Sequence, residues 1–325
     1  MSVILSICIP TYKMAQYLDY ALKSIAEQVT KEQLKQLEIC ISDNASPDNT
    51  TEIVKKWQKD SVVSIKYFCH QENKGMDENL LQVVKMAAGK YCWFLGSDDA
   101  LMPDAIARII REIGSADDPD IIFCNRIECD MGMNPKVNKP WLKQPKKDCL
   151  FNLAYDKSFI GYSKSVSSLG GLFSYLSSLV FKRSRWLDVK GYESYIGHHY
   201  LHIFMLFKFL EKGCKVKYVY DPLVYCRIND VYEKLFGHTK RLIHDLNAYS
   251  LLAEMTIKEK PDVLRAFNKL MYREHSYRNV WSYSACEPER KQWEEVIPYL
   301  RKFNYPEWVI YISTIRWLSK ILYRV

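Results

Sequence analysis

The stretch Tyr91-Cys92-Trp93-Phe94-Leu95-Gly96-Ser97-Asp98-Asp99 places two carboxylates directly after a short apolar segment. Residues 91–95 have the length and composition of a buried strand. Acidic side chains at the end of such a strand are not buried without partners. Carboxylate oxygens suit Mg²⁺ or Mn²⁺, so the pair predicts a metal site. The same residues could instead cap the helix that Pro103 helps to start.

Strands and helices alternate on either side of this stretch. The hydrophobic pattern predicts strands at 3–9, 37–42, 62–68, 91–95 and 120–124. It predicts helices at 15–28, 49–59, 77–88 and 103–113. Helices of this length between strands indicate βαβ units. We therefore expect an α/β fold with a doubly wound, mostly parallel, Rossmann-like sheet.

Polar residues follow each predicted strand, and ligands of parallel sheets bind beyond the carboxyl ends of the strands. Asp43 follows the second strand and faces the Asp98 segment in this arrangement. It could accept hydrogen bonds from a nucleobase or ribose. Alternatively, it forms an Asx-turn, because the residues around it are turn formers.

The rest of the chain is less regular up to about residue 235 and helical after it. We expect a helix at 200–210 and a strand at 215–220 that ends before Asp221-Pro222. From residue 239 the pattern is helical to the end. We divide the chain into an α/β domain at 1–235 and a helical C-terminal region at 236–325.

Composition narrows the partners. The formal net charge of +8 favours an anionic partner such as a nucleotide diphosphate, a lipid pyrophosphate or an acidic membrane surface. No nucleic-acid recognition signature is present, so we expect no nucleic-acid partner. Ten cysteines without a CxxC pair indicate reduced thiols. Without a signal peptide or a long apolar run, the expected location is cytoplasmic, or peripheral on the inner face of the cytoplasmic membrane.

The C-terminal segment predicts an amphipathic helix. Its apolar residues recur at helical spacing with Tyr311 beside them, and its basic residues form a stripe on another face. This helix could lie on an anionic membrane, or it could pack on its own protein. The apolar set is Trp308, Ile312, Ile315, Leu318 and Leu322, and the basic set is Arg316, Lys320 and Arg324.

Four sequence blocks resemble family 2 glycosyltransferases in order and spacing. They are residues 6–13 (Ser-Ile-Cys-Ile-Pro-Thr-Tyr-Lys), 42–50 (Ser-Asp-Asn-Ala-Ser-Pro-Asp-Asn-Thr), 73–79 (Asn-x-Gly followed by Asn) and 88–99 (Ala-Gly-Lys-Tyr leading to Ser-Asp-Asp). Residues 91–99 look closest to the abequosyltransferase-like branch that builds bacterial surface polysaccharides. The resemblance covers about 1–130 well and 160–230 loosely.

This resemblance implies a GT-A type fold, a nucleotide-diphosphate-sugar donor, and a glycan or polyprenyl-diphosphate-linked acceptor. By position, Thr11 and Tyr12 would line the nucleobase pocket, and Asp43 would bind the base. Asp98 would contact ribose or metal, and Asp99 would ligate Mn²⁺ or Mg²⁺. The full donor-binding set implied is Pro10, Thr11, Tyr12, Asp43, Asn73, Gly75, Asn79 and Asp98.

Two departures from the family pattern concern the chemistry. The family often has Asp-x-Asp-Asp where this chain has Gly96 at the first position. It also has Glu-Asp before a helix, whose Asp is the catalytic base. Counting back from Gly213 places His202 at that base position, with His199 one turn earlier as the alternative. A neutral imidazole is a competent base near neutral pH.

The expected activity is therefore an inverting, metal-dependent glycosyltransferase. The alternative is a GT-A-fold protein that binds nucleotides or acts as a scaffold but is catalytically impaired, which Gly96 and the missing Glu-Asp would explain. A nucleotidyltransferase or a dehydrogenase would need a glycine-rich loop after the first strand, and Pro10-Thr11-Tyr12 is not one.

Overall fold

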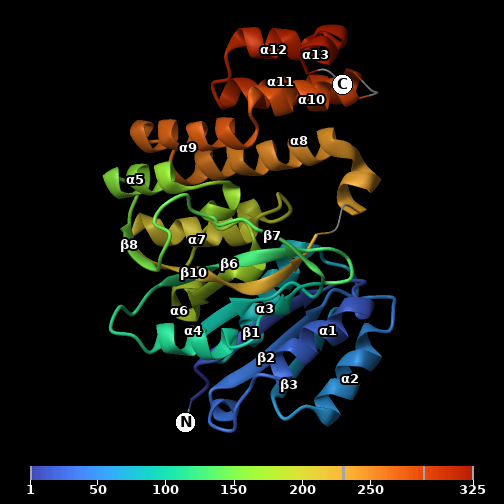
Figure 1. Cartoon of the computed structure of the whole chain (residues 1–325), viewed down its shortest axis with the longest axis vertical. Coiled ribbons are helices and arrows are strands. Elements are labelled where there is room, and N and C mark those ends of the chain that lie inside the picture. The colour runs from blue at the N-terminus through green and yellow to red at the C-terminus, as the bar shows by residue number, and fades with distance from the viewer. Residues whose placement is uncertain (1, 229–230, 288–289, 324–325) are drawn as a thin grey trace. The chain divides into compact units, whose positions relative to one another are not determined.

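The computed structural model describes residues 2–228, 231–287 and 290–323, and they form two compact units (Figure 1). The α/β unit comprises residues up to 154 together with 170–228. The helical unit comprises 155–169 and the chain after residue 228. The division at residue 235 expected from the sequence stays a prediction about functional domains.

A single twisted sheet forms the centre of the α/β unit. In spatial order the strands are β3 (Ser64–Cys69), β2 (Leu37–Asp43), β1 (Leu5–Thr11), β4 (Tyr91–Phe94), β9 (Leu179–Lys182), β6 (Ile121–Cys129), β10 (Cys214–Arg227) and β5 (Ala100–Leu101), with β7 (Pro135–Asn138) paired to β6 and β8 (Cys149–Leu153) paired to β10. Six of these strands point the same way, whereas β9 and the edge strand β5 run opposite to them. The α/β, mostly parallel sheet expected from the sequence is confirmed.

Helices cover both faces of this sheet because alternate side chains of each strand point to opposite faces. One face packs against α1 (Ala15–Ala26) and α4 (Ala105–Ile113), whose buried residues join those of β1, β2 and β4 in one apolar core. On the other face, Phe94 contacts Trp186 at 5.5 Å between ring centroids. The remaining helices of this unit are α2 (Thr50–Asp60), α3 (Met76–Met86), α6 (Arg183–Leu187) and α7 (Leu201–Glu211).

A buried polar network closes the amino end of the central strands. Glu38 is buried, accepts hydrogen bonds from Ser6 and from the Ala88 N–H, and pairs with Lys66 at 2.8 Å. Burial alone would raise the pKa of Glu38, but these partners hold it below its usual value. Gly89 packs against this network, where an added Cβ would lie 2.7 Å from the Ser6 nitrogen. The glycine of the Ala-Gly-Lys-Tyr block is thus required by a close backbone approach.

β10 is longer than the sequence predicts. The strand expected to end before Asp221-Pro222 continues to Arg227. Register shifts against β6 on both sides of Pro222 absorb the missing N–H, as β-bulges allow. All ten cysteines are free in the structure, and Cys8, Cys40 and Cys92 are buried, which is compatible with the expected reduced thiols.

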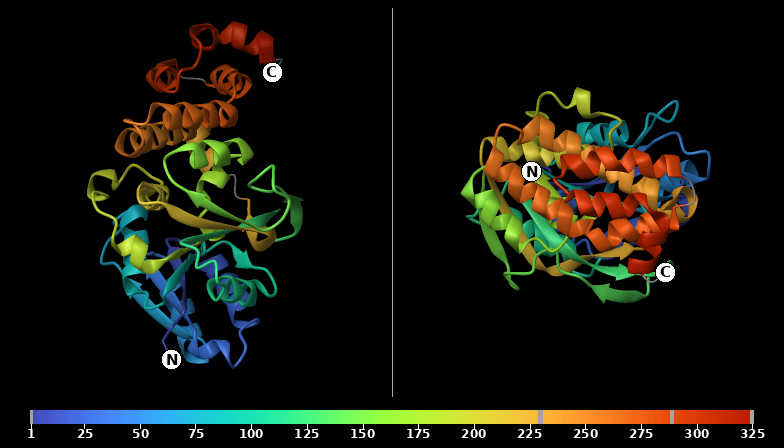
Figure 2. Two further views of the ribbon diagram at one scale, coloured as in Figure 1. Left: turned by 90° about the vertical axis from the view of Figure 1, so that its left-hand side faces the viewer. Right: turned by 90° about the horizontal axis from the view of Figure 1, so that it is seen from above.

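The helical unit confirms the helical C-terminal region, and its helices lie alongside one another (Figure 2). Buried Trp side chains anchor it: the Trp281 ring donates to the Val309 carbonyl, and the Trp293 ring donates to Ser313. The helices are α5 (Lys157–Ser165), α8 (Val231–Thr256, interrupted at Gly237), α9 (Pro261–Glu274), α10 (Tyr277–Cys286), α11 (Arg290–Lys302), α12 (Glu307–Thr314) and α13 (Arg316–Tyr323).

Within residues 2–228, 231–287 and 290–323, every helix falls short of the length and hydrophobicity needed to cross a bilayer.

Candidate active site

The carboxyl ends of β1 and β2 bring two predicted donor-binding residues side by side. Thr11 is paired with Asp43 in the strand register, and Pro10 precedes it opposite Ser42. Thr11 and Ser42 are buried, and within the described part of the chain their hydroxyl oxygens have no hydrogen-bond partner. Buried polar atoms are normally paired, so unpaired ones at a sheet edge are compatible with a polar ligand. Tyr12 follows at the edge, half-buried.

The Asp43 carboxylate is fully buried and already hydrogen-bonded. Its Oδ1 accepts from the Ser46 N–H at 2.9 Å, and its Oδ2 accepts from the Tyr67 hydroxyl at 2.8 Å. Asp43 therefore shapes the turn after β2, which is the alternative that the turn-forming residues around it left open. Its contact with a nucleobase stays a prediction.

The loops after β2 and β3 are tied together by an asparagine that the sequence did not single out. Asn44 donates to Asn73 Oδ1 at 2.8 Å and to the Gly75 carbonyl at 3.1 Å, and it accepts from the Lys74 N–H. Gly75, at φ +87°, then begins α3, and Asn79 in its first turns donates to the Thr11 carbonyl at 3.3 Å. Asn73, Gly75 and Asn79 thus lie at the same sheet edge as Thr11.

Asp99 is the most constrained carboxylate of this edge. It is 5% exposed, and its Oδ2 accepts hydrogen bonds from Tyr175 at 2.6 Å and Ser177 at 2.5 Å. Its Oδ1 accepts from the Arg227 backbone N–H at 3.1 Å. Burial first, and the Asp98 charge second, raise the pKa of Asp99 to about 7. Asp99 therefore joins the loop after β4 to η3 (Leu176–Ser178) and to the end of β10.

Asp98, in contrast to Asp99, is little constrained by hydrogen bonds from the protein. It is half-buried, and the described part of the chain supplies its carboxylate with no hydrogen bond other than one from its own backbone. Burial raises the pKa of Asp98, whereas the nearby Arg227 charge lowers it. Asp98 is consequently the carboxylate with oxygens available for a ligand.

The carboxylate oxygens at this edge can bind Mg²⁺ or Mn²⁺ only if the substrate supplies the remaining ligands of the metal ion. Among the described residues, no three or more Asp, Glu, His or Cys side chains gather into a metal-binding group. Mg²⁺ and Mn²⁺ sites in phosphate-using enzymes need only one or two carboxylates, because the substrate phosphates supply further oxygens. Asp98, backed by Asp99, matches that pattern.

The departure at Gly96 has a structural cause. The Gly96 N–H donates to Ser177 Oγ at 2.8 Å, and the same hydroxyl donates to Asp99. An added Cβ at Gly96 would lie 2.9 Å from Asp99 Oδ2 and 3.1 Å from Asp98 Oδ1. Ser177 and the two carboxylates therefore occupy the space that a side chain at position 96 would need.

His202 lies in the first turn of α7 and is 1% exposed. Its Nε2 is 3.1 Å from the Ser174 carbonyl, and its Nδ1 is buried without a partner in the described residues. Burial lowers the pKa of His202 to about 4, against a smaller opposing effect of the Ser174 carbonyl. The imidazole is therefore neutral at pH 7, but no acceptor hydroxyl can reach it in this conformation.

His199 lies on the loop just before α7 and is exposed. The loop is tied to α3, because the Gly197 N–H donates to the buried Asp77 carboxylate at 2.8 Å. His199 is thus the one of the two candidate bases whose side chain meets solvent.

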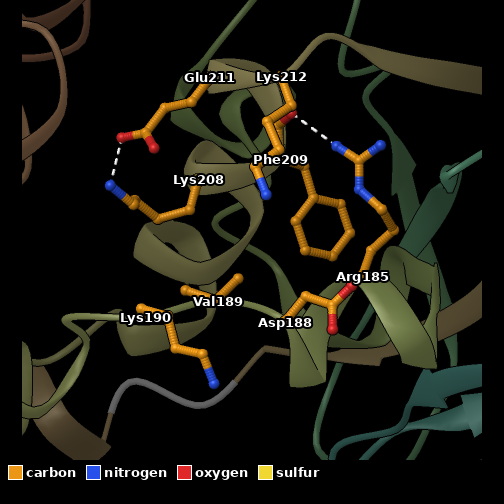
Figure 3. Close-up of a pocket in the computed structure, with 8 residues that line it drawn as sticks. All are labelled: Arg185, Asp188, Val189, Lys190, Lys208, Phe209, Glu211 and Lys212. Carbon is orange, nitrogen blue, oxygen red and sulfur yellow. Dashed lines mark hydrogen bonds and ion pairs between the residues drawn. The ribbon is translucent and has the colours of Figure 1, made fainter.

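A separate cavity of about 300 Å³ lies between α6 and the C-terminal part of α7 (Figure 3). Three of its charged side chains have partners in the protein, since Lys208 forms an ion pair with Glu211 and Arg185 donates to the Phe209 and Gly213 carbonyls. None of the predicted site residues lines it. The lining residues are Arg185, Asp188, Val189, Lys190, Lys208, Phe209, Glu211 and Lys212.

Comparison with known sequences identifies the family. Residues 6–167 match Glycosyl transferase family 2. An abequosyltransferase of Salmonella typhimurium, RfbV, is 38% identical over 287 residues, which are 87% of this chain and 84% of that protein. The chain belongs to glycosyltransferase family 2. The resemblance in the four sequence blocks, including the abequosyltransferase-like branch, is therefore confirmed.

A further relative and two solved structures are also similar to this chain. A Campylobacter jejuni GalNAc(5)-diNAcBac-PP-undecaprenol beta-1,3-glucosyltransferase is 36% identical over 109 residues, 33% of this chain and 34% of that protein. Staphylococcus aureus TarS 1–349 in complex with UDP-GlcNAc has a TM-score of 0.68 at 15% identity, covering 99% of this chain and 90% of that one. A mannosyltransferase of Pyrobaculum calidifontis in complex with GDP-Man and Mn²⁺ has a TM-score of 0.54 at 14% identity, covering 100% and 88%. The structural likeness confirms the GT-A type fold.

Gly96→Asp, which restores the acidic residue often found in the family, should destabilise the protein and not raise its activity. The new side chain would collide with Asp98 and Asp99 and add a third like charge. We expect a loss of about 1–3 kcal/mol in the free energy of unfolding, measured by urea denaturation. Gly114→Ala is the matched control, because its Cβ would meet nothing closer than 3.5 Å. Wild-type stability of Gly96→Asp would show that the carboxylate loop rearranges freely.

Proposed function

We propose that this glycosyltransferase is an inverting enzyme that moves a sugar from a nucleotide-diphosphate-sugar donor to a hydroxyl of a glycan acceptor in bacterial surface-polysaccharide or glycoconjugate synthesis. The observation that carries the proposal is the carboxylate pair after β4, in which Asp99 is held by three hydrogen bonds and Asp98 keeps its oxygens available. The complexes of the two similar structures with UDP-GlcNAc and GDP-Man support a nucleotide-sugar donor.

The enzyme is proposed to depend on Mn²⁺ or Mg²⁺, which Asp98 would hold and Asp99 would support. Such an ion would neutralise the diphosphate leaving group when bound. The side chains of this chain have a separate task, which is to place the donor. Thr11, Tyr12 and the loop at Asn73–Gly75 would line the nucleotide, since they surround the carboxyl end of β1.

In the proposed reaction, the acceptor hydroxyl oxygen attacks the anomeric carbon, and the bond from that carbon to the diphosphate oxygen breaks. The hydroxyl proton passes to a base on the enzyme. A single displacement of this kind inverts the anomeric centre. Of the two histidines expected from the sequence, we propose His199 as the base, because it is exposed whereas His202 is 1% exposed and hydrogen-bonded to Ser174.

The acceptor is proposed to be a polyprenyl-diphosphate-linked glycan, met by a peripheral enzyme at the inner face of the cytoplasmic membrane. The Campylobacter relative is named for an acceptor glycan that is linked to undecaprenol through a diphosphate. The helical unit also exposes large apolar side chains on α12 and α13: Trp308 at 54%, Tyr311 at 65%, Ile321 at 63% and Leu322 at 52%. Aromatic and aliphatic side chains of this kind favour the headgroup region.

The single C-terminal helix predicted from the sequence is two helices in the structure. α12 and α13 are separate because Ile315 between them has extended backbone angles. Ile312, Ile315 and Leu318 are partly buried. Arg324 and the side chains of Arg316 and Lys320 lie outside the described residues.

The alternative function is a catalytically impaired protein that binds nucleotide sugars or acts as a scaffold. The missing Glu-Asp before α7 favours it. Gly96 does not favour this alternative, because Ser177 occupies the space beside the remaining carboxylates and explains the glycine.

Thermal unfolding with UDP-, GDP-, CDP- and dTDP-sugars, each with and without Mn²⁺, tests the proposed donor. One nucleotide should stabilise the wild type by about 2.7 kcal/mol at 100 times its Kd. Asp98→Asn should remove the Mn²⁺-dependent part of this effect, while Asp99→Asn should also lower stability without ligand. Asp60→Asn, at an exposed carboxylate on α2, is the control. Equal Mn²⁺ effects in Asp98→Asn and wild type would refute the metal assignment. A donor that binds but yields no product in a transfer assay would favour the catalytically impaired protein.

His199→Ala should lower kcat for transfer by about 10²- to 10⁴-fold, the usual contribution of a general base, with donor affinity unchanged. His202→Gln should keep its activity. Steady-state kinetics and calorimetric donor titration separate the two effects. An inactive His202→Gln that is fully folded, beside an active His199→Ala, would restore His202 as the base.

His202→Gln carries its own stability check. The His202 pKa is about 4 in the folded protein and near 6.5 when unfolded, so the unfolded chain binds the proton first. The contribution of neutral His202 to the free energy of unfolding is therefore lost as pH falls from 6.5 toward 4. The free energy of unfolding of His202→Gln, measured by urea denaturation across this range, should lack this part of the pH dependence.

Membrane association is tested by co-sedimentation of the full chain with anionic vesicles. The wild type should pellet with the vesicles, and less so at high salt because exposed charges are screened. Replacing Tyr311, Ile321 and Leu322 by Ser should release the protein. The same change at Val62, Met131 and Leu187, which are exposed apolar residues of the α/β unit, is the control. A wild type that stays in the supernatant would show that α12 and α13 serve the fold alone.

A further inference from the structure

The loop before α7 has an unusual backbone. Gly197, His199 and Tyr200 have positive φ angles of 88°, 62° and 57°. Glycine adopts such angles freely, but His199 and Tyr200 carry side chains that make the left-handed region unfavourable. Non-glycine residues persist in this region when surrounding contacts determine the conformation, and they gather at functional sites. A contact must therefore hold this loop in place.

Asp77 supplies that contact. Its Oδ2 accepts the Gly197 N–H at 2.8 Å, and the carboxylate also accepts a hydrogen bond from the Leu201 backbone. These two amides stand on either side of His199 and Tyr200. Asp77 therefore brackets the strained residues by charge-assisted hydrogen bonds, which are about twice as strong as neutral ones.

Burial of the Asp77 carboxylate is energetically unfavourable, which a purely structural role does not require. It is 5% exposed, and its Oδ1 is buried without a partner in the described residues. Burial raises the pKa of Asp77, while the two backbone hydrogen bonds and then the charges of His199 and His198 lower it.

Asp77 also belongs to the donor side of the site. It lies in the first turn of α3, directly after the loop that Asn44 fastens through Asn73 and Gly75. Two residues later, Asn79 donates to the Thr11 carbonyl. The same turn of helix therefore contacts the end of β1 and the histidine loop, so that Asp77 fixes His199 relative to the donor-binding residues.

We propose that Asp77 is a positioning residue that holds His199 at the acceptor side of the site. This rests on the proposed function, in which His199 is the base. Asp77 acts through the backbone of the loop and does not itself contact the reacting atoms. Asp77 did not emerge from the sequence, because only its contact with a loop 120 residues away reveals it.

The test compares Asp77→Asn and Asp77→Ala with Glu78→Gln, a matched change at the neighbouring acidic residue of the same helical turn. Asp77→Asn is nearly isosteric and keeps one acceptor oxygen, so it preserves folding if the Ala variant does not. Amide hydrogen exchange is followed at Gly197 and Leu201. Their exchange should accelerate about tenfold or more in both Asp77 variants, the loss expected for a charge-assisted hydrogen bond, and remain unchanged in Glu78→Gln.

Kinetics then separate positioning from a general loss of structure. Asp77→Asn should lower kcat about 10- to 100-fold and leave the calorimetric donor Kd within about twofold. In a His199→Ala background, the same substitution should lower kcat no further, because both changes act on one group. A fully additive loss, or a loss found in donor Kd alone, would overturn the proposal.

The exchange measurement keeps this proposal distinct from the proposed function. Unchanged exchange at Gly197 and Leu201 in the Asp77 variants would overturn the positioning role even in an active enzyme. A wild type inactive with every donor would overturn the proposed function, and the exchange rates would still decide whether Asp77 holds the loop.

Discussion

The buried carboxylate of Asp99 is the constraint on which the site depends. A carboxylate that is 5% exposed is stable only with donors around it, and it receives them from Tyr175, Ser177 and the Arg227 N–H. These donors come from η3 and from the end of β10, so that a single side chain joins three segments. Because Asp99 turns inward to meet them, Asp98 remains available to a ligand. The two adjacent residues thus differ, since Asp99 is held by hydrogen bonds from the protein and Asp98 keeps oxygens available to a ligand.

The same principle recurs at the neighbouring strand ends, where polar side chains fasten one loop to the next. Asp43 fixes its turn through Ser46 and contacts Tyr67 of β3, and Asn44 fixes the loop after β3. Asp77 then ties the first turn of α3 to the loop before α7. These hydrogen bonds form a continuous framework around the edge of the sheet. Such a framework holds binding groups in place before a ligand arrives, which loops alone do not achieve.

The sequence predicts the local parts of this arrangement well. Strand and helix periodicity is local, so the α/β sheet and the carboxylates after β4 could be recognised directly. Tyr175 and Ser177 could not, because they meet Asp99 across 76 and 78 residues of chain within a stretch that shows only Gly and Ser enrichment. Without Ser177 in view, Gly96 looks like a lost ligand. In the structure, an added Cβ at Gly96 would crowd the Asp99 carboxylate at 2.9 Å, so that a side chain there would displace it.

The choice of base shows where counting along a helix stops being informative. Register fixes how far a residue lies from Gly213, but it does not say whether that residue meets solvent. In α7, both neighbours of His202 and most of the residues after it are buried, leaving Lys208 and Glu211 as the less buried positions. No residue in its first turn can therefore meet an acceptor without a large rearrangement. The proposed base, His199, lies instead on the preceding loop, where it is exposed and its φ angle of 62° falls outside the range of a right-handed helix.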